Sequence, residues 1–254
     1  MIIKTNRELL EHYDKLGPGD LFIGHLSAGP LTENLMVDLL ERGVRCLPSL
    51  LSQVLTRSKA AQAAVFKTWM LPHTRVISRR SDILNAISYY GKYSIGPVVT
   101  KEDRLNCGHG IRKWEDAEAM YNLLAFQDDT VSYPFVMQPY IENFTDVRVI
   151  LAGDYVEAYT RENRTSFRKN LSSGGYSRPF VLNNFQKKLC TEIMRRGQFP
   201  YAHIDLHILD DGTVYLSEIA LGGGTKGAVV TNRELNTMKK KLLDQMASFF
   251  SRNP

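Results

Sequence analysis

The sequence has few cysteines and no long apolar run, and both absences limit the kind of protein it can encode. Cys46, Cys107 and Cys190 are odd in number and far apart, without the spacing of metal ligands or of a disulfide framework. No stretch approaches the roughly 18 to 20 apolar residues that cross a bilayer. The amino-terminal segment carries acidic residues and no apolar targeting region. We therefore expect a cytoplasmic protein with reduced thiols and no membrane partner.

The basic charge lacks the clustering that a nucleic-acid-binding protein needs. The formal net charge is +5 and the isoelectric point is near 9.0, but pairs such as Arg79-Arg80 and Arg195-Arg196 are scattered. No aromatic-interleaved basic stripe, helix-turn-helix or zinc-finger spacing accompanies them. We expect solvated surface charge and no nucleic-acid partner, although such a field also attracts a small polyanion such as a nucleotide.

The first part of the chain predicts a small βαβ unit. With 254 residues, of which 43% are hydrophobic, the chain can bury a normal core but not more than two ordinary domains. A strand over 21–26, a helix over 33–42 that stops at Gly43 and a strand over 44–47 follow from the apolar pattern. The segment 58–70 begins with a serine cap and stops before Leu71-Pro72, which predicts a linker helix.

Two further zones follow, and neither contains a repeat or a low-complexity segment. Residues 74–138 indicate strand, helix, strand, Gly-rich turn, strand or loop, helix and strand. The third zone predicts a hairpin of strands 146–151 and 155–160, a helix over 184–196, a second hairpin of strands 201–210 and 213–220, and a final helix over 232–250.

The second hairpin carries two carboxylates that are candidates for a metal site. Pairing across the Asp211-Gly212 turn places Asp205 and Glu218 on neighbouring strands, where both can project from one face. Two converging carboxylates suit a hard divalent ion that shares its ligands with phosphates. The alternative is that both are ordinary surface residues. Each acid interrupts an otherwise core-like run, which favours function.

Seven segments in order resemble the successive motifs of RimK-type ATP-grasp ligases, and they cover most of the chain from about Ser58. They are VVTK (98–101), the Gly-His-Gly loop (108–110), VMQPYI (136–141), DVRV (146–149), FRKNLSSGG (167–175), HIDL (203–206) and SEIALGGGTKG (217–227). The resemblance implies an α+β / α/β protein with the ATP-grasp fold, in which two α+β lobes clasp ATP after a short βαβ unit. It divides the chain into a pre-ATP-grasp unit with linker helix (1–73), a small lobe (74–140) and a large lobe (141–254).

The same resemblance implies the site residues. Those for ATP are Lys59, Lys101, Gly108, Gly110, Gln138, Tyr140, Ile141, Asp146, Arg168 and Asn170. Those for Mg²⁺ or Mn²⁺ are Asp205, Glu218 and Asn170. Lys101 and Arg168 would be the catalytic cations, and the loop at 108–110 a lid over the nucleotide. Position alone suggests Lys226, Gly223 and Gly224 for an anionic acceptor.

Ordinary structural roles compete with several of these assignments. Lys101 can be a solvated strand end, the loop at 108–110 a plain turn, and Tyr140 and Ile141 core residues. Lys169 and Arg178 are expected to face solvent.

Two positions depart from the family pattern. Ala220 stands where relatives usually carry a metal-binding Asn, and Pro139 where they commonly have Glu, so a metal ligand and a backbone donor are missing. The short amino-terminal unit leaves few residues for a substrate pocket.

The resemblance implies an ATP-dependent carboxylate-amine ligase that works through an acyl phosphate and joins a small-molecule or peptide carboxylate to an amine. Two alternatives stay open: a phosphotransferase of the same fold, and, because of Ala220, a nucleotide-binding protein with reduced catalysis. The sequence names neither substrate, and it leaves a homo-oligomer possible.

Overall fold

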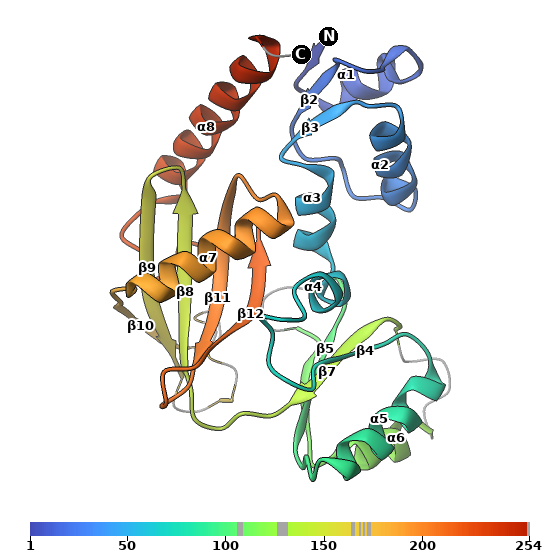
Figure 1. The fold of residues 1–254 in the computed structure, drawn as a ribbon, viewed down its shortest axis with the longest axis vertical. Coiled ribbons are helices and arrows are strands. Elements are labelled where there is room, and N and C mark those ends of the chain that lie inside the picture. Colours follow the sequence, from blue (N-terminus) through green and yellow to red (C-terminus); the bar gives the residue numbers. More distant parts are fainter. Residues whose placement is uncertain are drawn as a thin grey trace.

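The computed structural model describes residues 1–105, 109–125, 132–163, 166–167, 169, 171 and 174–252. These residues form three sheets, with strand orders β1-β2-β3, β4-β7-β5-β6 and β10-β9-β8-β11-β12. Each sheet belongs to one of the three zones of the sequence, and in Figure 1 the parallel sheet lies at the top, the four-stranded sheet at the bottom and the five-stranded sheet between them. The mixed α and β architecture expected from the sequence is confirmed.

The amino-terminal unit is a parallel three-stranded sheet with helices beside it. Strands β1 (Ile2–Ile3), β2 (Leu21–Ile23) and β3 (Arg45–Leu47) pair in parallel. The predicted helix is present as α2 (Thr32–Glu41). The sequence pattern did not reveal β1, the short helix α1 (Asn6–Glu11) or the 3-10 turn η1 (Tyr13–Lys15). The unit therefore contains the predicted βαβ arrangement with one more strand.

Two short helices connect this unit to the rest of the chain. Helix α3 (Leu50–Arg57), which was not predicted, begins at a Ser49 cap, and α4 (Lys59–Val65) begins at the predicted Ser58 cap. The prediction that this second helix reaches Met70 was wrong. The Trp69 carbonyl accepts a hydrogen bond from the Leu216 amide (2.7 Å), so this stretch leaves the helix to meet β12.

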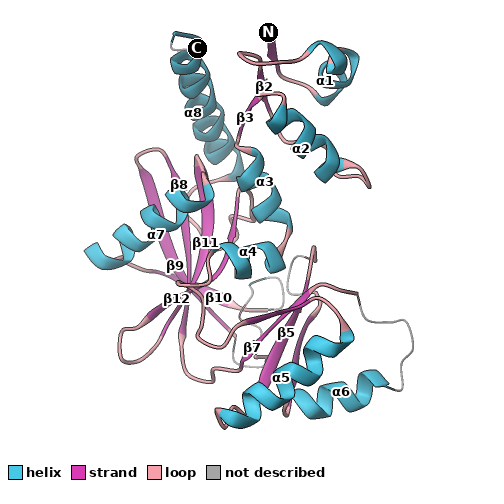
Figure 2. Ribbon diagram, turned by 45° about the vertical axis from the view of Figure 1, so that its right-hand side comes forward, coloured by secondary structure: helices cyan, strands magenta, loops and turns pink. Residues whose placement is uncertain are grey.

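The second sheet is antiparallel and carries two helices on one face (Figure 2). Its strands are β4 (Arg75–Ile77), β5 (Val98–Glu102), β6 (Ile111–Trp114) and β7 (Phe135–Pro139). The helices are α5 (Arg80–Lys92) and α6 (Ala117–Ala125). This confirms the predicted order of elements. Tyr90 of α5 is buried against this sheet, and its hydroxyl donates to the Met137 carbonyl (3.2 Å).

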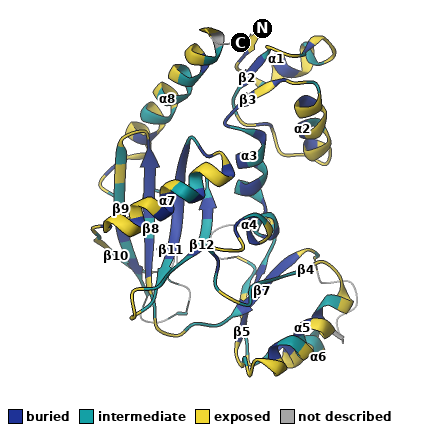
Figure 3. Cartoon of the chain, in the orientation of Figure 1, coloured by how far each residue is buried: buried dark blue, intermediate teal, exposed yellow. Residues whose placement is uncertain are grey.

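The third sheet has one apolar and one polar face. Its strands are β8 (Thr145–Ala152), β9 (Tyr155–Glu162), β10 (Tyr176–Pro179), β11 (Tyr201–Ile208) and β12 (Val214–Ala220). Helix α7 (Asn184–Gly197) lies across one face, and Ala202, Ile204 and Leu206 of β11 share its buried core (Figures 1 and 3). Since side chains alternate along a strand, the residues between them face the other way. That face carries the candidate site.

Helix α8 (Asn232–Arg252) joins the third sheet to the amino-terminal unit. Ala247 is buried with Leu21 and Leu47 of the parallel sheet, and the helix also contacts β8. In the described ranges, no helix combines the length and apolar character needed to cross a membrane. The predicted boundaries after residues 73 and 140 fall in the connections before β4 and after β7; the division into lobes stays a prediction.

Cys46 and Cys190 are buried free thiols, and burial raises the pKa of each to about 12. Cys107 lies outside the described residues.

Candidate functional site

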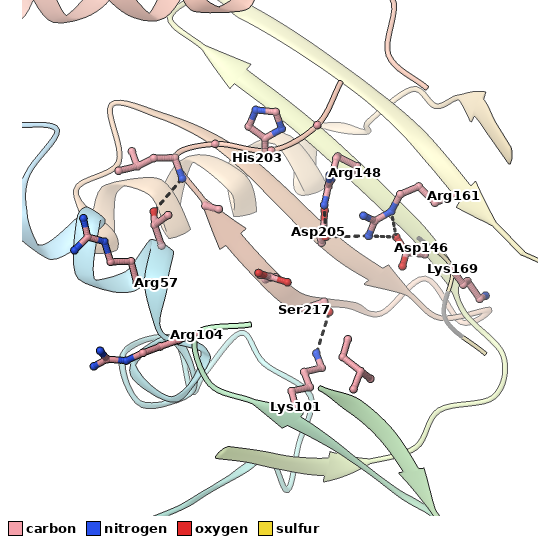
Figure 4. Close-up of a pocket in the computed structure, with 18 of the residues that line it drawn as sticks. Arg57, Lys101, Arg104, Asp146, Arg148, Arg161, Lys169, His203, Asp205 and Ser217 are labelled. Atoms are coloured by element: carbon pink, nitrogen blue, oxygen red, sulfur yellow. Dashed lines mark hydrogen bonds and ion pairs between the residues drawn. The ribbon is translucent and has the colours of Figure 1, made fainter. Parts of the chain in front are cut away.

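A cavity of about 1060 Å³ lies between the two antiparallel sheets and the amino-terminal unit. Strands β5 and β7 supply one wall, the polar face of β8, β9, β11 and β12 supplies another, and the segment 25–34 with the end of α3 supplies the third. Figure 4 shows the charged side chains that gather there. Ten predicted site residues line it: Lys101, Gln138, Tyr140, Ile141, Asp146, Asp205, Glu218, Gly223, Gly224 and Lys226.

Lys101 projects from β5 toward the larger sheet. Its ammonium donates to the Ser217 hydroxyl of β12 (3.2 Å), so it reaches from the four-stranded sheet to the five-stranded one (Figure 4). The residue is only 9% exposed. Burial lowers the pKa of Lys101, and the nearby Glu218 carboxylate opposes that shift. The alternative role as a solvated strand end is therefore wrong for this lysine.

The segment after β7 forms the edge of the cavity. The Tyr140 amide donates to the Pro97 carbonyl (2.8 Å), and the Lys113 ammonium lies 3.6 Å from the centre of the Tyr140 ring. Tyr140 and Ile141 are half-buried rather than core residues. Pro139, Tyr140 and Ile141 all reach the cavity, but Pro139 has no amide N–H to offer a ligand.

Four charged side chains form one network beside the cavity, three of them buried and Arg148 half-buried. Arg148 donates to both oxygens of Asp205 (2.7 and 2.8 Å), Arg161 also reaches Asp205 (2.9 Å), and Arg161 donates to Asp146 (2.8 and 2.6 Å) (Figure 4). The strand register causes this arrangement, since Asp205 pairs with Arg148 and Asp146 with Arg161. Although burial alone would raise it, Arg148 and Arg161 hold the pKa of Asp205 well below its usual range.

Asp205 and Glu218 lie directly opposite each other on β11 and β12, as the hairpin predicted. Their surroundings differ. Three hydrogen-bonding positions of Asp205 are taken by arginines. Glu218 accepts no hydrogen bond from a described residue, and its only ion pair in those ranges is with Lys59 at 4.0 Å.

The metal set implied by the resemblance is therefore only partly met. Glu218 has free oxygens toward the cavity, whereas Ala220 offers none and Asp205 is occupied. Within the described part of the chain, no group of three or more metal-binding side chains comes together. These residues fit a site in which Glu218, phosphate oxygens and water together bind one hard divalent ion. They do not fit a site in which protein side chains surround the ion.

The remaining predicted residues have other positions. Lys59 does not line the cavity; its ammonium donates to the Leu105 carbonyl. Gly110 has a φ of +73°, and an added Cβ would lie 2.7 Å from the Glu102 and Leu105 side chains, so this turn needs glycine. The Lys226 ammonium donates to the Leu171 carbonyl (2.9 Å). Gly108, Arg168 and Asn170 lie outside the described residues.

Several lining residues were missed from the sequence. Arg148 and Arg161 belong to the buried network, and His203 and His207 project from β11 beside Asp205. Lys169 was expected to face solvent, but it lines the cavity and donates to the Phe144 carbonyl (2.6 Å). Arg178 is exposed as expected. A period-2 pattern of polar residues at 203, 205 and 207 was the available signal for the histidines.

His203 is the most unusual of these side chains. It is 3% exposed, and neither ring nitrogen has a hydrogen-bond partner among the described residues. Burial lowers its pKa to about 3, and the positive charge of Lys239 adds to this shift. Its cross-strand partner is Ala220, and an added Cβ on Gly223 would lie 2.9 Å from its Nδ1. A neutral imidazole thus faces the cavity under the glycine loop.

Solved structures with this arrangement define the fold. D-alanine–D-alanine ligase from Bacillus anthracis, complexed with ATP, is 15% identical, with a TM-score of 0.63 over 95% of this chain and 84% of that chain. D-cycloserine synthetase DcsG is 13% identical, with a TM-score of 0.62 over 89% and 84%. A RiPP-associated ATP-grasp ligase from Chryseobacterium gregarium, in complex with ADP and a leader and core peptide, is 16% identical, with a TM-score of 0.59 over 89% and 77%. The fold is that of the ATP-grasp proteins.

Residues 51–245 match the RimK-like ATP-grasp domain. The chain belongs to this family, as the ordered motifs suggested. No curated protein matches the sequence.

Proposed function

We propose that the protein is an ATP-dependent carboxylate-amine ligase that forms an acyl phosphate and then an amide. The observation that carries this proposal is the buried Lys101, which reaches across the cavity of a RimK-like ATP-grasp chain to the strand that bears Glu218. A buried ammonium next to an open carboxylate suits a bound triphosphate, which needs both a positive charge and a metal-binding oxygen.

The nucleotide is assigned to the end of the cavity between β5, β7 and β8. Val99, Gln138 and Tyr140 would enclose the base, and Asp146 would face the ribose. Lys101 would contact the phosphates, with Arg168 and Asn170 as further candidates by resemblance. Lys59 is better placed to orient Glu218 at 4.0 Å than to touch the nucleotide.

A divalent ion bound by Glu218 and phosphate oxygens would neutralise the charge that develops on the transferred group. In this proposal Asp205 acts mainly by orienting Arg148 and Arg161. For Asp205 to bind the ion as well, one of its arginine contacts has to be exchanged, because three of its acceptor positions are filled.

The chemistry proceeds in two displacements. A carboxylate oxygen of the acid attacks the γ-phosphorus of ATP, the bond from that phosphorus to the ADP oxygen breaks, and an acyl phosphate forms. The amine nitrogen then attacks the acyl carbon, the carbon–oxygen bond to phosphate breaks, and the nitrogen loses a proton to solvent. The buried position of Lys101 fits stabilisation of the transferred phosphoryl group in a site shielded from water.

Either a small molecule or a peptide can supply the carboxylate. The neighbouring folds include a D-alanine–D-alanine ligase and a ligase bound to a leader and core peptide, so both sizes occur on this architecture. Ala220 is the observation that favours the second candidate function, a nucleotide-binding protein with reduced catalysis.

Hydroxylamine trapping tests the ligase proposal without the natural amine, because hydroxylamine converts an acyl phosphate into a stable hydroxamate. The full chain is incubated with Mg-ATP, hydroxylamine and pools of carboxylic acids and short peptides, and hydroxamate and ADP are measured. We expect equal amounts of both, and neither with Lys101→Ala. A phosphorylated product without hydroxamate would instead show a kinase, and nucleotide binding without ADP formation would show reduced catalysis.

A further inference from the structure

The cavity-facing side of β11 runs from the nucleotide end of the cavity toward the amino-terminal unit. Its residues are His207, Asp205, His203 and Tyr201, and successive members are about 6.6 Å apart along the strand. The His207 ring lies 4.1 Å from the ring of Phe144, near the predicted nucleotide end. The Tyr201 hydroxyl contacts His25 Nε2 (3.3 Å) in the amino-terminal unit. Asp205, which lies opposite Glu218, is therefore between the two ends of this face.

A second cavity of about 460 Å³ continues the path at the Tyr201 end. It shares His25, Leu221 and Gly222 with the large cavity, and α8 forms its outer wall. Its charged lining residues are Lys4, Lys239, Lys240 and Asp244. Asp244 is already 3.9 Å from the Lys4 ammonium, so the two remaining lysines leave this cavity positive.

Lys239 is the most enclosed of these lysines. Its ammonium donates to the Leu221 carbonyl (2.9 Å) and lies 4.9 Å from the centre of the Tyr201 ring. No carboxylate of a described residue lies within ion-pair distance of it. Burial lowers the pKa of Lys239 to about 8, which is the expected result for a partly buried cation without a counter-charge. Removing an ammonium from water costs free energy unless an anion compensates for it.

His203 lies between this lysine and the facing pair of Asp205 and Glu218. Both of its nitrogens are buried without a partner in the part of the chain that the structure describes, although a buried polar atom normally has one. The ring lines the large cavity while its nitrogens are covered, Nδ1 by Gly223, so a bound molecule supplies the missing hydrogen bonds when this loop moves aside. Within the described ranges, Lys239 thus lacks a counter-charge and His203 lacks a hydrogen-bond partner, and the two residues occupy adjoining positions along one path.

We propose that the Tyr201 end of the site binds a carboxylate of the substrate that does not react, with Lys239 as its counter-charge and His203 contacting the substrate between this carboxylate and the reaction centre. The proposal rests on the proposed function and narrows it. One of the two joined molecules carries an additional carboxylate: either the acid is a dicarboxylate, or the amine is an amino acid or a peptide with a free carboxyl end.

A purely structural role for Lys239 makes a different prediction. If its contacts with Leu221 and Tyr201 only hold α8 in place, its replacement lowers the free energy of unfolding and leaves carboxylate binding unaffected. Lys241→Gln is a matched control, because Lys241 lies on the same helix, is exposed and does not line the second cavity.

Calorimetric titration of the ADP- and magnesium-saturated full chain tests the proposal. One set of probes is malonate, glutarate and pimelate, and the other is glycine, 4-aminobutyrate and 6-aminohexanoate; whichever set binds identifies the molecule that carries the additional carboxylate. We expect at least one probe to bind, and Lys239→Gln to weaken that binding about tenfold or more while Lys241→Gln leaves it unchanged. Binding by ADP should be equal in all three proteins.

The proposal is overturned if no probe binds the ADP-saturated protein, or if Lys239→Gln binds the probes as tightly as the native chain. Failure of ADP itself to bind would contradict the proposed function instead. In that case the probes are titrated into the native chain and into Lys239→Gln without ADP. A difference in probe binding between these two proteins then tests the carboxylate site independently of the nucleotide.

Discussion

Replacing Asp205 should destabilise the fold far more than replacing Glu218, although the two residues face each other across the same hairpin. Asp205→Asn leaves the half-buried Arg148 without a carboxylate partner, while Arg161 keeps Asp146. Removing one partner of a buried ion pair costs about 3–5 kcal/mol. For a chain of this size that lowers Tm by roughly 6–20 °C.

Glu218→Gln should cost less than about 1 kcal/mol, because its ion pair with Lys59 spans 4.0 Å and the Glu218 side chain is 32% exposed. Both free energies of unfolding come from urea denaturation followed by circular dichroism. Adding Arg148→Met to Asp205→Asn should recover part of the loss, since the unpaired guanidinium is then gone. A cost below about 1 kcal/mol for Asp205→Asn would refute the assignment of Asp205 to a structural charge network.

Four further predictions follow from individual contacts. Mg-ATP at a hundredfold excess over Kd should stabilise the native chain by about 2.7 kcal/mol in thermal denaturation, and Lys101→Ala should remove most of that shift. Ala220→Asn should lower the magnesium concentration needed for half-maximal ADP formation by adding an oxygen ligand; an unchanged requirement would show that this position does not reach the ion. Gly223→Ala should weaken ligand binding because the added Cβ would lie 2.9 Å from His203 Nδ1. Gly224→Ala should leave ligand binding unchanged, because its added Cβ would have no atom within 4 Å. Equal effects of the two substitutions would contradict this packing. Burial lowers the pKa of His203 in the folded chain to about 3, so only the unfolded chain binds a proton at this histidine as the pH falls below about 6.5. The free energy of unfolding should therefore drop by about 2 kcal/mol by pH 5. His203→Asn should lack this part of the pH dependence.

Local patterns in the sequence predicted the elements well where a turn or cap was explicit. The Asp211-Gly212 turn gave the hairpin and the facing pair of Asp205 and Glu218. The Gly153-Asp154 turn gave the β8–β9 hairpin, and its two-residue connection already implies that Asp146 pairs with Arg161. That pair could have been predicted and was missed.

Other features depend on contacts between segments far apart in the sequence. The pairing of Arg148 with Asp205 follows from β8 lying beside β11, and no turn connects those strands. The environment of Lys239 depends on how α8 packs against the amino-terminal unit, which a helical periodicity cannot show. Strand β1 has two residues and α3 has eight, so their patterns were too short to stand out.

The most direct test of the account is a calorimetric titration of the full chain with ADP in the presence of magnesium. We expect one nucleotide to bind per chain, Lys101→Ala to lose most of the affinity, and Glu218→Gln to show weaker magnesium-dependent binding. Absence of nucleotide binding, or the same affinity in the native chain and Lys101→Ala, would contradict the assignment of this cavity as the ATP site.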